Sequence, residues 1–417
     1  MRIELICVGH ELLYGKLNSH IAYIGEHLSD IGLQLNSART IPDDLEEMTA
    51  TFKDAFVKAD ITIITGGLGP TFDDLTREAA AKALNKKLIR NEELLKKLEQ
   101  YMASRGYKFS LKGNENQAYL IEGAKTIENK FGTAPGQFLE HNNKLIVILP
   151  GPPKEMHTMF ESFLAPLLKN KYCGIIAKSK TIHIFGLGES KVNEIIKPII
   201  ETERKLEDGS VSFTILAHLS GVNIKTTVTG TDSMLVDEIM HSIKAEFYRV
   251  LKDYIYGEDA QTLESIVGDL LIKHKSTLSV AESCTGGLIA NRLTNIPGSS
   301  LFFQGGIVSY SNHSKIEILK VNPEVIDKNG AVSEPTALEM AKGAKALTKS
   351  DYAVAISGIA GPSGGTPEKP VGTVCFALVT PKKNKTETVH FIGTRLEIKE
   401  RSANHVFNIL RLELQAH

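Results

Sequence analysis

Cysteine is scarce in this chain, with only four among its 417 residues. Cys7, Cys173, Cys284 and Cys375 stand far apart in the sequence, and no two of them form a CxxC pair. Disulfide frameworks and zinc sites both depend on closely patterned cysteines, so this spacing argues against both. Scattered, unpaired cysteines are typical of proteins that stay in a reducing compartment such as the cytoplasm.

The chain also lacks a long apolar run and an excess of charge of one sign. No apolar stretch reaches the roughly 18 residues of a membrane span, and the first residues lack signal-peptide architecture. Basic residues number 48 and acidic residues 49, a net charge of −1. A balanced charge without a basic field argues against nucleic acid as a partner. We therefore expect a cytoplasmic protein that binds neither membranes nor nucleic acids.

The length of 417 residues exceeds one ordinary core and predicts several domains. We place the boundaries at 1–170, 171–256 and 257–417. The first segment alternates helices with the apolar strands Ile3–Val8, Ile61–Thr65 and Leu145–Leu149. Continuous apolar strands between helices indicate a parallel sheet covered on both faces.

The middle segment has a different pattern. A predicted hairpin, Val211–Ala217 with Val222–Thr229, lies between the helices Ser190–Glu203 and Ser233–Leu251. This order favours a small α+β domain of KH-like type, but no GxxG clamp is present, so RNA binding is not expected. The last segment returns to an α/β pattern. The predicted fold is therefore α/β, with two parallel-sheet α/β/α domains joined by a small KH-like α+β domain.

The clearest chemical signal is the stretch around Ser283, which follows the predicted strand Thr277–Ala281 and precedes a glycine-led helix. A serine there is exposed to substrate, and the amides of Thr285, Gly286 and Gly287 could hold an oxyanion or a phosphate.

A serine nucleophile needs a base. Lys315 can serve if burial depresses its pKa, with Tyr310 relaying a proton or fixing the lysine. Cys284 is a rival nucleophile, although it should point the opposite way in an extended segment. The plainer interpretations are a capping serine and a surface lysine.

A second signal lies in the loop 65–76 between a buried strand and a helix. Gly66, Gly67 and Gly69 let backbone amides approach an anion, and the carboxylates of Asp73 and Asp74 follow. Mg²⁺ binds through one or two carboxylates plus substrate phosphates, so the loop indicates a metal-assisted phosphate site. The alternative is a tight turn in which Asp73 caps the helix.

Several long motifs resemble the CinA (competence/damage-inducible) family over essentially the whole chain. In the first segment they are GHELLYGKLNSH (9–20), TGGLGPTFDDLT (65–76), NKFGTAPG (129–136) and LPGPPKEM (149–156). In the last they are AESCTGG (281–287), PGSS (297–300), GGIVSYSNHSK (305–315), GAVSE (330–334), SGIAGPSGG (357–365) and EKPVGTV (368–374). Residues 1–168 resemble a molybdopterin-binding-type domain, and residues 258–417 resemble a nicotinamide-nucleotide amidase domain.

The resemblance implies two hydrolytic activities in a cytoplasmic homodimer. The last domain would deamidate nicotinamide mononucleotide without a cofactor, with Ser283, Tyr310 and Lys315 as catalytic residues. The first would cleave ADP-ribose with a divalent metal (Mg, Mn or Co).

The remaining candidate residues fall into three groups. Those expected to bind the amidase substrate are Thr285, Gly286, Gly287, Asn312, Gly358, Gly361 and Arg395. Those expected to bind ADP-ribose are Gly66, Gly67, Gly69, Thr71, Asn18 and Thr133. Those expected to bind the metal are Asp73, Asp74 and Glu11.

Four positions depart from the family pattern: His10, His20, Thr394 and Lys399. A rival hypothesis is a non-enzymatic adaptor in competence or DNA damage, which the intact Ser/Tyr/Lys set argues against. A short-chain dehydrogenase is disfavoured because Tyr310 and Lys315 lie five residues apart and no GxGxxG fingerprint follows a strand.

Overall fold

The computed structural model describes residues 1–106, 114–172, 174, 176–204, 206 and 209–416. These residues form two compact units. The first comprises residues 1–179, 205–211 and 227–239, and the second comprises residues 180–204, 212–226 and 240–417. Among the helices of the described segments, none combines the length and the apolar composition needed to cross a membrane.

The first unit is built on a six-stranded sheet in the order β2-β1-β3-β8-β7-β6. Its strands are β1 (Ile3–Val8), β2 (Leu35–Ile41), β3 (Ile61–Thr65), β6 (Lys125–Ile127), β7 (Gly136–His141) and β8 (Lys144–Leu149). A small sheet pairs β4 (Leu88–Arg90) with β5 (Tyr119–Ile121). Strands β1 and β3 are buried along their whole length, as expected for a sheet covered on both faces.

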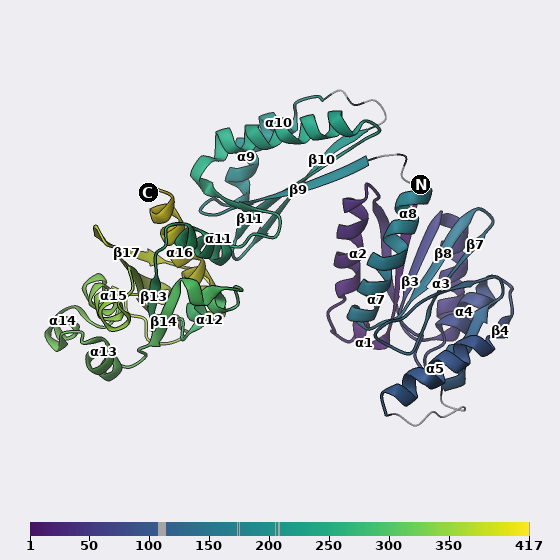
Figure 1. The fold of residues 1–417 in the computed structure, drawn as a ribbon, viewed down its shortest axis with the longest axis horizontal. Coiled ribbons are helices and arrows are strands. Elements are labelled where there is room, and N and C mark those ends of the chain that lie inside the picture. Colours follow the sequence, from purple (N-terminus) through teal and green to yellow (C-terminus); the bar gives the residue numbers. More distant parts are fainter. Residues whose placement is uncertain (107–113, 173, 175, 205, 207–208, 417) are drawn as a thin grey trace. The chain divides into compact units, whose positions relative to one another are not determined.

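Helices cover the two faces of this sheet (Figure 1). One core cluster packs α2 (Ser19–Asp30), α7 (Pro153–Met159) and α8 (Ala165–Tyr172) against one face. Another packs α3 (Leu45–Lys58) and α4 (Thr76–Ala83) against the other. The short helix α1 (His10–Leu13) follows β1, and α5 (Glu92–Ser104) follows β4; the π-helical turn Phe160–Leu164 links α7 to α8.

The sheet is parallel only in part. Strand β7 pairs antiparallel with both β8 and β6. The hairpin between β7 and β8 turns at Asn142 and Asn143, whose φ values are 50° and 61°. Two consecutive left-handed residues form the type I′ turn that favours asparagine, and this signal was available in the sequence.

The second unit contains a five-stranded sheet in the order β14-β13-β15-β16-β17. Its strands are β13 (Leu278–Glu282), β14 (Phe303–Val308), β15 (Tyr352–Gly358), β16 (Thr373–Val379) and β17 (Asn384–His390). Strand β13 is parallel to β14 and β15, whereas β16 is antiparallel to both of its neighbours, β15 and β17. The predicted α/β fold is confirmed, but each of the two large sheets is mixed.

Two helical layers flank this sheet (Figure 1). Helices α11 (Leu263–Lys273), α12 (Leu288–Thr294) and α16 (Arg395–Gln415) contribute to one apolar core. Helix α15 (Glu334–Thr348) lies over the other face, with α13 (Asn312–Leu319) and α14 (Pro323–Asn329) beside it.

A four-stranded sheet in the order β10-β11-β9-β12 lies between these regions in the sequence. Its strands are β9 (Ile176–Ile184), β10 (Ser210–His218), β11 (Gly221–Gly230) and β12 (Ile255–Glu258). The helices are α9 (Glu189–Ile200) and α10 (Ser233–Leu251). The predicted hairpin between two helices is therefore confirmed as β10 and β11.

Candidate active site

Ser283 directly follows β13, at the edge of the sheet where its parallel strands end. Its backbone N–H donates to the carbonyl oxygen of Ile356 on β15 at 3.0 Å, which extends the strand pairing by one residue. Its side chain is only 8% exposed. The sheet therefore fixes the position of the hydroxyl.

Lys315 reaches the serine from helix α13. Ser311 starts this helix through a capping box with Ser314, which places Lys315 on the buried side of its first turn. Lys315 is 1% exposed, and its Nζ lies 3.0 Å from Ser283 Oγ. The same Nζ lies 2.8 Å from the carbonyl oxygen of Ser309 and 3.4 Å from that of Tyr310.

Among the described residues, Lys315 Nζ forms no ion pair with a carboxylate, and its three hydrogen-bond partners are uncharged oxygens. Burial therefore lowers the pKa of Lys315, because desolvation penalises the ammonium form. A deprotonated amine has two N–H groups and one lone pair, which matches two carbonyl oxygens and one hydroxyl.

Cys284 lies next to Ser283 but in a different environment. Its side chain is 6% exposed and belongs to the apolar core beneath helices α11, α12 and α16. Burial raises the pKa of the Cys284 thiol to about 12. Since the thiolate is the reactive form, the structure favours Ser283 over Cys284 as nucleophile.

The loop after Ser283 is held by a residue that the sequence interpretation missed. Glu282 is fully buried, and its carboxylate accepts hydrogen bonds from the amides of Gly287, Ile289 and Ala290 at 2.9 to 3.2 Å. These are amides of the first turn of α12, which has no side-chain cap of its own. The anion at this helix N-terminus is therefore the protein's own carboxylate.

This arrangement changes the expected use of the loop amides. We expected Gly286 and Gly287 to present theirs to substrate, but the Gly287 amide binds Glu282 and the Gly286 amide donates to the Ser283 carbonyl at 3.1 Å. Thr285 is fully buried, and within the described chain its hydroxyl has no hydrogen-bond partner.

Tyr310 and Arg395 form a separate group. The Tyr310 hydroxyl accepts from Arg395 Nη2 at 3.0 Å, and Arg395 Nη1 donates to the Gly361 carbonyl at 2.7 Å. Tyr310 is 61% exposed and meets Lys315 through its backbone carbonyl rather than its ring. The predicted proton relay through the tyrosine hydroxyl is thus not the arrangement seen here.

The other predicted substrate-binding residues of this domain lie in three different settings. Asn312 is exposed on the first turn of α13. Gly358 ends β15, where a Cβ would lie 2.8 Å from Val374 Cγ2. Gly361 has φ +77°, and a Cβ there would lie 2.5 Å from Val371 Cγ1, so both glycines have a packing explanation.

In the first unit, the loop after β3 is shaped by close backbone packing. A Cβ on Gly66 would lie 2.2 Å from the Val8 carbonyl oxygen, and one on Gly67 would lie 2.2 Å from Thr76 Oγ1. A Cβ on Gly69 would lie 2.4 Å from Asp74 Oδ2. Gly66 and Gly67, which also have positive φ values, are therefore required by the backbone and its packing, whereas Gly69 meets only the movable end of the Asp74 side chain.

A buried arginine holds this loop from the inside. Arg77 on α4 is fully buried, and it donates to the carbonyls of Leu68 at 2.8 Å and Gly69 at 3.3 Å. Its Nε has no partner in the part of the chain that the structure describes. By holding the loop carbonyls inward, Arg77 leaves the exposed side of the loop to Thr71, Phe72 and Asp73, with Asp74 half-buried beside them.

The three predicted metal ligands do not come together. Asp74 accepts from the backbone N–H of Thr71 at 2.9 Å and from the Thr71 hydroxyl, whereas Glu11 pairs with Lys16 at 3.2 Å. Among the described residues, no three His, Cys, Asp or Glu side chains are grouped to hold a metal ion. Asp73 and Asp74 fit only the mode in which one or two carboxylates share Mg²⁺ with substrate phosphates.

Two further predicted residues of this domain have internal partners. Asn18 caps α2 through the amide of His20 at 3.1 Å and donates to Thr40 Oγ1 at 3.2 Å. Thr133 accepts from Gln117 Nε2 at 2.9 Å.

Comparisons with known proteins match three family models along the chain. They are "Probable molybdopterin binding domain" over residues 4–170, "Damage-inducible protein CinA KH domain" over 179–257 and "CinA C-terminal domain" over 260–414. A CinA-like protein of Endomicrobium trichonymphae is 46% identical, over 100% of this chain and 99% of its own length. The chain belongs to the CinA family. A second CinA-like protein, from Dictyoglomus thermophilum, is 40% identical over 99% of this chain and 98% of its own.

Solved structures of CinA proteins are also similar. A competence/damage-inducible protein from Agrobacterium tumefaciens is 37% identical, covers 37% of this chain and 95% of its own, and has a TM-score of 0.35. The CinA protein of unknown function from Thermoplasma acidophilum is 33% identical, covers 40% of this chain and 97% of its own, and has a TM-score of 0.38.

The four departures from the CinA pattern have local structural roles. The ring Nδ1 of His10 accepts from the backbone N–H of Asp43 at 3.2 Å, and His20 is buried with Nδ1 2.9 Å from Thr65 Oγ1. Thr394 caps α16 through a capping box with Glu397. Lys399 Nζ lies 3.8 Å from the position that a Cβ on Gly286 would take, so this cation faces the loop after Ser283.

Proposed function

We propose that the last domain deamidates nicotinamide mononucleotide to nicotinate mononucleotide and ammonia. The observation that carries this proposal is the buried Lys315 Nζ, 3.0 Å from the Ser283 hydroxyl, with its pKa lowered by burial. A neutral amine next to a fixed hydroxyl is the combination that activates serine for attack on a carbonyl.

The Ser283 hydroxyl and the Lys315 amine can carry out each step of the deamidation. Ser283 Oγ forms a bond to the carboxamide carbon while its proton passes to Lys315 Nζ, within hydrogen-bond reach. The tetrahedral intermediate collapses with cleavage of the C–N bond, and Lys315 returns the proton to the leaving nitrogen, which departs as ammonia. Water then attacks the acyl-enzyme ester while Lys315 Nζ accepts a proton from it. The bond between the acyl carbon and Ser283 Oγ breaks, Lys315 returns the proton to Oγ, and nicotinate mononucleotide is released.

The polar surroundings suggest how the substrate is held. The Gly286 and Gly287 amides are engaged within the protein, and the backbone groups of Cys284 and Thr285 interact with the Cys284 thiol, so we assign no amide of this loop to the oxyanion. Arg395 and Lys399 supply positive charge on the exposed side of the loop for a phosphate. We assign Tyr310 to orienting Arg395, because its hydroxyl binds that guanidinium.

The test is ammonia release from nicotinamide mononucleotide by the purified chain. Ser283→Ala should reduce it by at least about 10³-fold, because the covalent route is lost. Cys284→Ala is the matched control and should retain most of the rate. Loss of activity in Cys284→Ala with retention in Ser283→Ala would make the cysteine the nucleophile. A Ser283→Ala variant that still supports DNA uptake would instead favour an adaptor role for the protein.

We propose as a second function that the first domain hydrolyses ADP-ribose to AMP and ribose 5-phosphate. The supporting observation is that Arg77 turns the loop carbonyls inward, so that the exposed side carries Asp73 and Asp74. A divalent cation bound there would neutralise charge on the diphosphate. Asp73→Ala should abolish metal-dependent AMP formation, with the exposed Asp30→Ala of α2 as control. Unchanged turnover in Asp73→Ala, or none in the parent with Mg, Mn or Co, would contradict this second function.

A further inference from the structure

Arg292 on helix α12 connects three helices of the second unit. Its guanidinium is bidentate to Glu264 of α11, with Nε 3.2 Å from Oε1 and Nη2 2.7 Å from Oε2. Its Nη1 donates to Asn404 Oδ1 at 2.8 Å and to Glu400 Oε2 at 3.3 Å, and both of these residues lie on α16. Hydrogen bonds from one planar group therefore fix α12 against both α11 and α16.

These contacts are sheltered from water. The side chains of Arg292 and Glu264 are 15% and 14% exposed, and Asn404 is fully buried. Asn404 uses both ends of its amide, because its Nδ2 donates to the carbonyl oxygen of Leu219 at 3.3 Å. The guanidinium also lies 4.8 Å from the centroid of the Phe407 ring. Bidentate hydrogen bonds are directional, whereas apolar packing is not, so this group sets how α12 is aligned along α16.

The two helices that Arg292 joins carry the two halves of the candidate active site. Helix α12 follows the Ser283 loop, and Glu282 binds the amides of its first turn. Helix α16 begins with Arg395 and carries Lys399 in its second turn, the two cations proposed for the phosphate. One of the Arg292 contacts on α16 is with the residue directly after Lys399. The separation of the nucleophile from these cations therefore depends on how α12 docks against α16.

We propose that Arg292 is a positioning residue, which sets the distance between the Ser283 hydroxyl and the phosphate-binding cations of α16. This inference rests on the proposed amidase function for the identity of the substrate, a nucleotide that carries its carboxamide and its phosphate on different groups. Arg292 touches neither group. It holds the two helices in the alignment in which Ser283 meets the carboxamide while Arg395 and Lys399 meet the phosphate.

The experiment is calorimetric titration of the full chain carrying Ser283→Ala, so that the substrate is not consumed. The two probes are nicotinamide mononucleotide and nicotinamide riboside, which differ only in the phosphate. The nucleotide should bind more tightly, and Arg292→Met should reduce this preference by about tenfold, the value of one charge-assisted hydrogen bond. The affinity for the riboside should not change. An unchanged preference, an equal loss of affinity for both probes, or no binding of the nucleotide would overturn the proposal.

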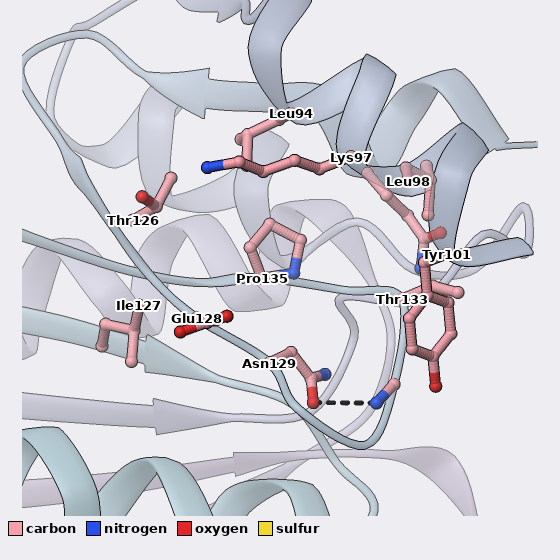
Figure 2. A pocket seen from close by; sticks show the side chains of 12 residues that line it. Leu94, Lys97, Leu98, Tyr101, Thr126, Ile127, Glu128, Asn129, Thr133 and Pro135 are labelled. Atoms are coloured by element: carbon pink, nitrogen blue, oxygen red, sulfur yellow. Dashed lines mark hydrogen bonds between the residues drawn. The ribbon is translucent and has the colours of Figure 1, made fainter. Parts of the chain in front are cut away.

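Lys97→Met is the matched control, because it also removes a cation that pairs with a glutamate. Lys97 Nζ lies 2.8 Å from Glu93 Oε1 on α5, and its side chain lines a cavity of the first unit (Figure 2). The preference for the nucleotide should be intact in this variant. A fall in Lys97→Met would place the phosphate contact in the first unit and contradict the proposal.

Two further variants separate positioning from stability. Arg292→Met leaves Glu264 without its partner, so a lower melting temperature is expected whatever the role of the arginine. Arg292→Lys keeps a charge beside Glu264 but lacks the planar fork, so it should remain folded and lower the preference by about threefold. In a chain that already carries Arg395→Met and Lys399→Met, Arg292→Met should have little further effect, because the cations that it positions are gone. An undiminished effect in that chain would also contradict the proposal.

The amidase proposal and the positioning proposal can fail separately. If the chain with Ser283 intact releases no ammonia while the preference for the nucleotide depends on Arg292, the positioning proposal stands and the amidase proposal falls. If ammonia is released and Arg292→Met leaves the preference unchanged, only the positioning proposal falls.

Discussion

The two candidate sites share a plan and differ in the sign of the charge that holds them. In each, a fully buried strand ends in a glycine-containing loop that leads into a helix, β3 to α4 in the first unit and β13 to α12 in the second. In the second unit a buried carboxylate, Glu282, gathers backbone N–H groups. In the first a buried guanidinium, Arg77, gathers backbone carbonyls.

The opposite charges of Glu282 and Arg77 determine which backbone groups each loop presents to a ligand. Where Glu282 has taken the helix amides, those amides are not available to a ligand, and the chemistry is left to the pair Ser283 and Lys315. Where Arg77 has taken the carbonyls, the exposed side is left with Asp73 and Asp74, which suit a cation and a phosphate together. Similar strand–loop–helix units thus support different reactions because a single buried residue selects which backbone groups face inward.

The largest effect that would sharpen the comparison is expected from Lys315→Met. Methionine has a similar length but cannot accept a proton, so ammonia release should fall by about 10³-fold. The variant leaves the Ser309 carbonyl without its Lys315 partner and should lower stability by about 2 kcal/mol, so calorimetry should first show that it is folded. ADP-ribose hydrolysis in the same preparation is the control and should not change. If Lys315→Met still released ammonia, Lys315 would be a structural residue. The second site would then not depend on a lysine base.

The next prediction concerns the two buried charged residues, Glu282 and Arg77. Glu282→Gln keeps one acceptor oxygen but replaces the other by an NH2 group that faces backbone N–H groups, and it should lower stability by about 2 kcal/mol. Arg77→Met leaves the Leu68 and Gly69 carbonyls unpaired and should cost a similar amount, about 2 kcal/mol. Calorimetry should show additive losses in the double variant, since the two residues share no partner. Strong coupling between them would mean that the two loops are not independent.

Much of this was predictable from the sequence, and the omissions have physical reasons. Apolar strands that end in glycine loops located Ser283 and the aspartate loop, because parallel strands present their carboxyl ends at one edge. The burial of Lys315 was not predictable from spacing alone, since lysine side chains are mostly exposed. It depends on the cap at Ser311, which starts α13 at a fixed point and turns Lys315 inward.

The two holding residues were missed although each left a signal. Glu282 is the last residue of β13 (Leu278–Glu282), in which every residue is buried. The signal is a charged residue that continues a buried strand. Arg77 lies three and four residues before the buried Ala80 and Ala81, so helical spacing places it on the core face. A charge on a buried face is the pattern that identifies such residues.

The pH dependence of the two activities should also separate the sites. Burial lowers the pKa of Lys315, and the residue acts as a base only when neutral. The kcat/KM for ammonia release should therefore rise tenfold per pH unit below this depressed pKa and level off above it. The rate of ADP-ribose hydrolysis should not show this tenfold rise per pH unit, because the described loop 65–76 contains no lysine and is held by Arg77 and Asp74. An ammonia-release profile that stayed flat from about pH 6 to about pH 10 would argue against the lysine base.

The smallest effect is expected from Tyr310→Phe, which separates positioning from proton transfer within the amidase site. The hydroxyl binds Arg395 at 3.0 Å, and Arg395 keeps its second contact with the Gly361 carbonyl without it. Loss of one exposed hydrogen bond should raise KM by about threefold with little change in kcat. Arg395→Met, which removes the cation itself, should raise KM further. A fall in kcat of about 10²-fold in Tyr310→Phe would instead restore the proton relay, because that is the range for general acid–base groups.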